Sequence, residues 1–123
     1  MLIHIETEEL PERGLLQISL DIRATINITA DEARRKVSAY AGNEISDLLS
    51  GEAPDLVCHR NEAYWRVPVI LSSKSLGRIG LVGFIDINVE TGELQLAEKD
   101  AQEIEDNARR LSEVSMTVSH RTP

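Results

Sequence analysis

Residues 16–28, LQISLDIRATINI, are the stretch on which the expected fold depends most. Apolar residues occupy every even position from Leu16 to Ile28, and every odd position between them is polar. A period of two over this length is typical of a β-strand that has one face on a core and the other in water. We therefore predict a long strand here, bent or bulged along its course.

Two further stretches downstream show the same alternation. They are residues 64–71, YWRVPVIL, and residues 79–89, IGLVGFIDINV, with a polar loop at 72–77 between them. This order predicts a hairpin, and Pro68, which has no backbone N–H, predicts a sheet edge or a bulge within it. Shorter strands are predicted at 55–59 and around 94–96, and residues 2–5 form either a short strand or a lead-in.

Helical periodicity marks two other segments, at about 30–50 and about 98–111. Thr29 has the character of an N-cap, with Glu32 three residues later, and apolar residues at helical spacing follow from Ala33 to Leu49. Gly51 and Pro54 are expected to end this helix. The second helix has a narrower apolar stripe, and residues 112–123 are predicted to be a flexible tail or, through the alternation at 114–118, an edge strand.

Together these elements predict a single α+β domain over residues 1–111. Consecutive strands with short connections favour an antiparallel sheet of four to five strands, with the two helices packed on one face. A chain of 123 residues is long enough for one continuous core.

The charge balance limits the partners. The chain carries 21 acidic and 13 basic residues, a formal charge of −8, which repels nucleic-acid phosphates and anionic lipid. Cys58 is the only cysteine, so an intrachain disulfide is impossible. The early residues have no basic and apolar secretion signal, and the predicted location is the cytoplasm.

Three short motifs between about Ala30 and Leu96 resemble the PepSY-like domain. Residues 31–34, DEAR, match its helix opening, residues 64–67, YWRV, match its aromatic strand, and residues 85–93, IDINVETGE, match its closing strand and turn. The resemblance implies a small binding or regulatory module, and in some members of the family a role in restraining peptidases.

No catalytic, cofactor or metal site is predicted. Gly77, Gly80 and Gly83 precede no helix that would bind phosphate, so they predict a twisted strand closely approached by another element. Cys58 and His59 are neighbours and point to opposite faces of a strand, so they do not chelate one ion together. The many paired carboxylates are interpreted as solvated strand and helix faces.

The strongest functional prediction is an exposed patch on the outer face of the sheet. Its members are Tyr64, Arg66, Ile70, Val82 and Phe84, residue types that protein interfaces favour. The patch favours a non-catalytic protein-interaction module that forms a homodimer through this face or through the alternating first strand. Two alternatives stay open: a regulatory domain that binds a small molecule or peptide, and an acidic inhibitor or antitoxin-type partner of a basic protein.

Overall fold

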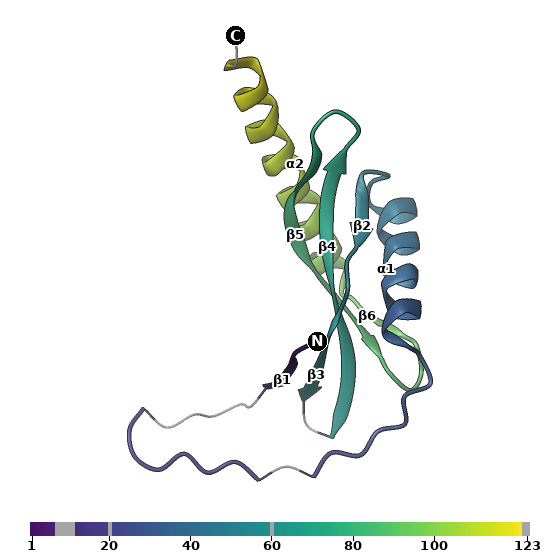
Figure 1. Cartoon of the computed structure of the whole chain (residues 1–123), viewed down its shortest axis with the longest axis vertical. Helices are drawn as coiled ribbons and strands as arrows, with labels where there is room; N and C mark the ends of the chain where they lie inside the picture. Colours follow the sequence, from purple (N-terminus) through teal and green to yellow (C-terminus); the bar gives the residue numbers. More distant parts are fainter. Residues whose placement is uncertain (7–11, 20, 60, 122–123) are drawn as a thin grey trace.

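The computed structural model describes residues 1–6, 12–19, 21–59 and 61–121 (Figure 1). Its elements follow in the order β1 (Ile3–Glu6), α1 (Ala30–Glu44), β2 (Leu49–Gly51), β3 (Asp55–His59), β4 (Glu62–Ser73), β5 (Gly77–Asn88), β6 (Leu94–Gln95) and α2 (Glu98–Arg121). The predicted α+β class is confirmed, because both helices pack against one mostly antiparallel sheet.

The sheet has six strands where four to five were predicted. Its order is β1-β3-β4-β5-β6, and only the β1–β3 pair is parallel. One edge of β4 is shared, since β3 pairs with residues 62–66 and β2 pairs with residues 69–71. Pro68 lies between these two pairings, and its carbonyl accepts from the backbone N–H of Glu52 at 2.9 Å on that edge. A missing N–H at this point interrupts no ladder, which explains why the strand tolerates a proline.

The β4–β5 hairpin supplies the largest share of the core. Its predicted alternation is confirmed in β4, where Trp65, Val67 and Val69 are buried, and in β5, where Ile85 and Ile87 are buried. Both helices contribute to the same cluster; their buried members are Ala33, Val37, Ala41, Ile104 and Ala108. The hairpin and the two helices therefore form one hydrophobic core on one face of the sheet.

Helix α1 starts as predicted. The Oγ1 of Thr29 accepts from the backbone N–H of Glu32 at 3.1 Å and donates to the Glu32 carboxylate at 3.2 Å. These bonds satisfy a free donor in the first turn and fix the start of the helix. The apolar stripe then buries Ala33, Val37 and Ala41 completely against the sheet.

The predicted end of α1 near residue 50 is wrong, because the helix ends at Glu44 and residues 49–51 form β2. Pairing with β4 gives these residues ladder hydrogen bonds that replace those of a longer helix. Gly51 permits this close packing: a Cβ there would lie 2.9 Å from Val67 Cγ1 and 3.0 Å from the carbonyl oxygen of Arg34. Leu49 is buried in this strand, whereas Leu48 lies outside it and is exposed, so neither belongs to a helical stripe.

Helix α2 begins at Glu98, as predicted, but continues to Arg121 instead of ending near 111. The predicted tail, and the alternative edge strand at 114–118, are therefore wrong for residues 112–121, and residues 122–123 lie outside the described residues. No glycine or proline occurs between 98 and 121, so nothing in the sequence stops the helix. In Figure 1 its last turns extend past the end of the β4–β5 hairpin.

The predicted close approach is confirmed at Gly80 and Gly83 but not at Gly77, where a Cβ would have no described neighbour within 4 Å. A Cβ on Gly83 would lie 2.8 Å from Ile104 Cγ1, and one on Gly80 would lie 3.0 Å from Leu111 Cδ2. Helix α2 thus packs directly on the backbone of β5. This contact fixes the position of the helix relative to the sheet.

The predicted first strand is wrong. The described residues of 12–28, which we call the arm, form no helix or strand, and Figure 1 shows them as an extended loop away from the sheet. Hydrogen bonds attach its end to the sheet: the backbone N–H groups of Asn27 and Ile28 donate to the carbonyl of Val89, at 2.9 and 3.0 Å. Ile22 and Ile28 pack against the core, whereas Leu16 and Ile18 are exposed.

Candidate functional site

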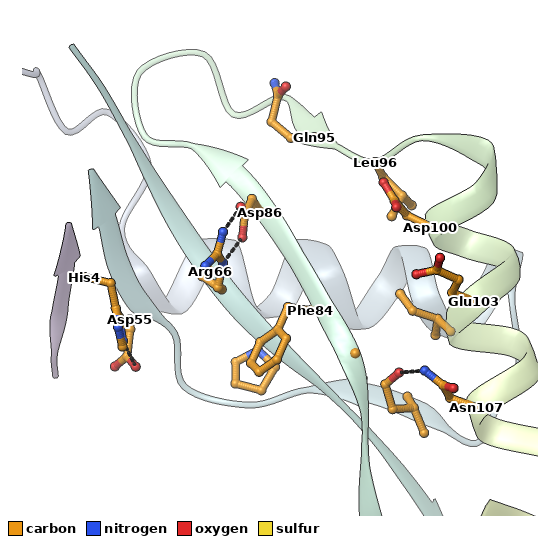
Figure 2. A pocket seen from close by; sticks show the side chains of 14 residues that line it. His4, Asp55, Arg66, Phe84, Asp86, Gln95, Leu96, Asp100, Glu103 and Asn107 are labelled. Atoms are coloured by element: carbon orange, nitrogen blue, oxygen red, sulfur yellow. Dashed lines mark hydrogen bonds and ion pairs between the residues drawn. The ribbon is translucent and has the colours of Figure 1, made fainter. Parts of the chain in front are cut away.

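A groove of about 620 Å3 extends from the outer face of the sheet, where Arg66 and Phe84 line it, past β5 to the first half of α2 (Figure 2). Its apolar lining comes from three elements and the segment before α2; the residues are Pro68, Val82, Phe84, Leu96 and Ile104. Phe84 is the most exposed of them, with 51% of its surface accessible. An aromatic ring is thus presented to solvent inside a concave surface.

Helix α2 forms one wall of the groove through Asp100, Glu103 and Asn107. The side-chain amide of Asn107 donates to the carbonyl of Val82 at 2.9 Å, which attaches the helix to β5. The side chain of Glu103 makes no hydrogen bond or ion pair with any described residue, so its carboxylate is available to a partner.

The opposite wall is a histidine–aspartate pair on β1 and β3. His4 Nε2 lies 3.0 Å from Asp55 Oδ2, and the backbone N–H of Leu2 donates to Asp55 Oδ1 at 3.1 Å. The His4 hydrogen bond, followed by that from Leu2, lowers the pKa of Asp55 below its usual value. Asp55 therefore stays ionised at neutral pH, and it ties the start of the chain to β3.

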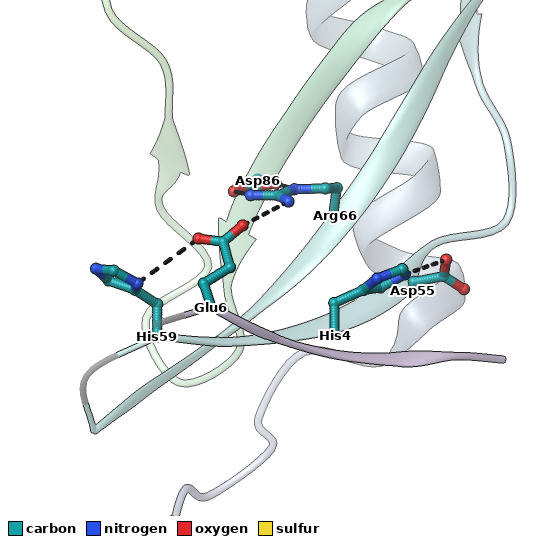
Figure 3. Close-up of polar contacts among 6 residues, drawn as sticks. All are labelled: His4, Glu6, Asp55, His59, Arg66 and Asp86. Atoms are coloured by element: carbon teal, nitrogen blue, oxygen red, sulfur yellow. Dashed lines mark hydrogen bonds and ion pairs between the residues drawn. The ribbon is translucent and has the colours of Figure 1, made fainter. Parts of the chain in front are cut away.

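Arg66 of β4 is bonded to β5 and to β1, close to the wall that His4 and Asp55 form (Figure 3). Its guanidinium donates twice to Asp86, at 2.9 Å to each carboxylate oxygen, and once to Glu6 at 2.7 Å. These carboxylates, Asp86 first, raise the pKa of Arg66 further above its usual value. Glu6 also lies 3.6 Å from Nδ1 of His59, which is buried without a hydrogen-bond partner among the described residues.

We expect Arg66→Met to destabilise the domain by about 1–2 kcal/mol, because it leaves Asp86 and Glu6 close together without a cation. The loss is smaller than for a fully buried pair, since 32% of the Arg66 side chain and 22% of the Asp86 side chain are exposed. Urea unfolding followed by circular dichroism measures the change.

A matched control is Arg78→Met. Arg78 makes a similar two-bond pair with Glu52, but 58% of its side chain is exposed. We expect a loss of at most about 0.5 kcal/mol there. Equal losses for the two variants would contradict the structural role assigned to Arg66.

Three of the five residues predicted to form an interface patch lie in the groove. Arg66, Val82 and Phe84 line it, but Val82 is only 2% exposed. Ile70 is also 2% exposed, and it lies between Ser50 of β2 and Leu81 of β5. The predicted exposed patch is therefore wrong for Ile70 and Val82.

Tyr64, the fifth predicted interface residue, lies outside the groove. Its side chain is half-buried, and its hydroxyl donates to the Glu62 carboxylate. This hydrogen bond, helped by burial, raises the pKa of Tyr64 to about 12. The phenol thus remains protonated and committed to a neighbour on its own strand.

Sequence reasoning missed the walls of the groove. The wall residues are His4, Asp55, Asp100, Glu103 and Asn107. The dense acidity of the last helix is visible in the sequence, but it was interpreted as a solvated face. In the structure, Ile104 of this helix and the exposed Phe84, 20 residues earlier in the chain, line the same groove. The spacing of residues in the sequence does not show that the helix and Phe84 lie together.

The groove is suited to ionic and apolar binding. Its lining carries four carboxylates and one guanidinium, those of Asp55, Asp86, Asp100, Glu103 and Arg66. No serine, threonine, cysteine or lysine is among the lining residues. Within the described part of the chain, no three His, Cys, Asp or Glu side chains converge as metal ligands do.

Comparison of the chain with protein-family models, with curated proteins and with solved structures found no match. The resemblance to PepSY-like domains therefore stays a prediction. Of the helices in the described residues, none has the length and apolar character needed to cross a membrane.

Proposed function

We propose that this domain is a non-catalytic protein-interaction module whose groove binds a basic, apolar-containing segment of another protein. The observation that carries the proposal is Phe84, half exposed in a concave surface with carboxylates on both sides. Exposed aromatic side chains in such surfaces tend to mark interfaces.

The chemistry of the groove selects the partner. Apolar side chains of a bound segment would cover Phe84 and Leu96, while lysine or arginine side chains would reach Asp100 and Glu103 on α2. A cation placed over the ring of Phe84 adds a further attraction. The net charge of −8 would also speed the approach of a basic partner.

Binding without catalysis fits the groups in the groove. A histidine–aspartate pair can act as a general base, but here His4 and Asp55 are 47% and 37% exposed. General acid–base catalysis favours a sheltered carboxylate or histidine with a pKa near the working pH, and Asp55 is shifted the other way. The free, buried Cys58 suits the reducing cytoplasm as the working compartment.

The test uses a short synthetic peptide that alternates arginine with leucine, labelled for fluorescence anisotropy. We expect a dissociation constant between about 1 µM and 1 mM, the range for contacts worth roughly 4–8 kcal/mol. Binding should weaken as salt rises, because the charges are partly exposed. Replacing arginine by glutamate in the peptide should abolish binding.

Two variants and a matched control locate the site. Phe84→Ala and Glu103→Gln should each weaken binding about three- to tenfold. Glu105→Gln removes the same charge from the same helix but lies outside the groove, next to Arg109, and should leave binding unchanged. Equal affinity for all four proteins, or no binding of the basic peptide, would refute the proposal.

A further inference from the structure

The arm carries a strand pattern that its own chain does not use. In residues 15–19, an extended chain places the apolar Leu16 and Ile18 on one face, and Leu15, Gln17 and Ser19 on the other. Leu16 is 55% exposed and Ile18 is 49% exposed, and none of these five residues makes a backbone hydrogen bond with another described residue. An apolar strand face without a sheet is thus left in solvent.

In the part of the chain that the structure describes, the sheet has an unpaired edge along β1. Among the described residues this strand pairs with β3 alone, so they leave the backbone groups of its other edge unpaired. Ile3 and Ile5 are 64% and 47% exposed, although they lie on the core face, beside Leu56 and Cys58 of β3. An open edge with exposed apolar residues is a template for another strand.

The two surfaces match in length and in character. Residues 15–19 offer one strand of five residues, and β1 has four. A strand added to β1 would place Leu16 and Ile18 beside Ile3 and Ile5, extending the core face. Leu15, Gln17 and Ser19 would then lie on the face of His4 and Glu6, next to the groove.

We propose that two copies of this chain exchange arms, residues 15–19 of each copy adding a strand to the β1 edge of the other. Figure 1 shows the arm as a wide loop that extends beyond its own sheet before it returns to α1. The bonds from Asn27 and Ile28 to Val89 hold the end of the arm. When each copy gives its arm to the other, the result is a closed two-fold dimer. The β1 edge and the apolar arm face of each copy are then covered. The dimer uses a surface separate from the floor of the groove.

Sedimentation equilibrium of the full chain tests the exchange. We expect a dimer at micromolar concentration, and at least about a hundredfold weaker association for Leu16→Lys/Ile18→Lys, because two apolar side chains no longer become buried. The control Gln17→Lys/Ser19→Lys adds the same charge to the other face of the same segment and should remain dimeric. Unchanged circular dichroism shows that each variant is folded.

Amide hydrogen–deuterium exchange of residues 12–19, measured by mass spectrometry, distinguishes an arm that pairs with a second copy from an arm that pairs within its own chain. We expect slow deuterium uptake in the concentrated dimer and fast uptake after dilution to monomer. Three results overturn the proposal: a monomer at all concentrations, a dimer unaffected by Leu16→Lys/Ile18→Lys, or arm protection that persists in the monomer.

Discussion

Trp65→Ala is expected to destabilise the domain by about 3–5 kcal/mol, the usual loss when a large core aromatic is truncated. Trp65 is 4% exposed and lies in the core on β4. Its indole N–H also donates to the carbonyl of Ile28 at 2.7 Å, which ties the end of the arm to the sheet. Because a domain of this size has only about 5–15 kcal/mol of stability, the variant should be close to unfolded at 37 °C.

Urea unfolding followed by far-ultraviolet circular dichroism measures this loss without depending on tryptophan fluorescence. Trp65→Phe is the matched control, since it keeps an apolar ring but removes the hydrogen bond to Ile28. We expect it to lose about 1–3 kcal/mol, less than the alanine variant. If Trp65→Ala unfolded at the same urea concentration as the parent, the core described here would be incorrect.

Gly83→Val is expected to destabilise the domain by about 1–3 kcal/mol and to loosen α2. A Cβ at this position would lie 2.8 Å from Ile104 Cγ1, so the helix must shift away from β5. The same shift would weaken the Asn107–Val82 bond and change the wall of the groove. Urea unfolding gives the free energy, and the loss of peptide affinity reports the movement of the wall.

Two further variants separate this steric effect from a general effect of losing glycine. The loss for Gly83→Val combined with Ile104→Ala should be smaller than the sum of the two single losses, because the smaller side chain makes room for the valine. Gly42→Ala is the control: a Cβ there has its nearest neighbour at 3.7 Å, so in helix α1 it should stabilise by about 0.5–1 kcal/mol. Fully additive losses in the double variant would contradict the close packing of α2 on β5.

The sequence was sufficient for the hairpin and not for the arm, although both alternate with period two. The alternating stretches of β4 and β5 are joined by a short loop, which brings the two strands side by side, so their backbone hydrogen bonds form between neighbours in the sequence. Residues 16–28 have the same pattern, but a strand needs a second strand for its backbone bonds, and a pattern does not supply one. The same limit applies to β2, whose pairing with distant residues 69–71 overrode the helical spacing of Leu48 and Leu49.

The site was predicted in part, and a bulge explains one of the errors. Val69 pairs with Gly83 and Ile70 with Leu81, so Val82 is an extra residue on β5 and turns into the core. An extra residue in a strand moves the side chains beyond it to the other face of the sheet. Counting every second residue back from Phe84 does not reveal such an extra residue. Arg66 and Phe84, on the regular side of the bulge, lie where alternation placed them.

Nuclear magnetic resonance mapping of the arginine–leucine peptide on the isotopically labelled domain tests the docking groove most directly. The account predicts that backbone signals of residues 82–86 and 100–107 shift on titration, together with the side-chain amide of Asn107, while residues 33–41 of α1 do not move. Shifts concentrated on α1 and β2, or spread evenly over the surface at saturating peptide, would contradict it.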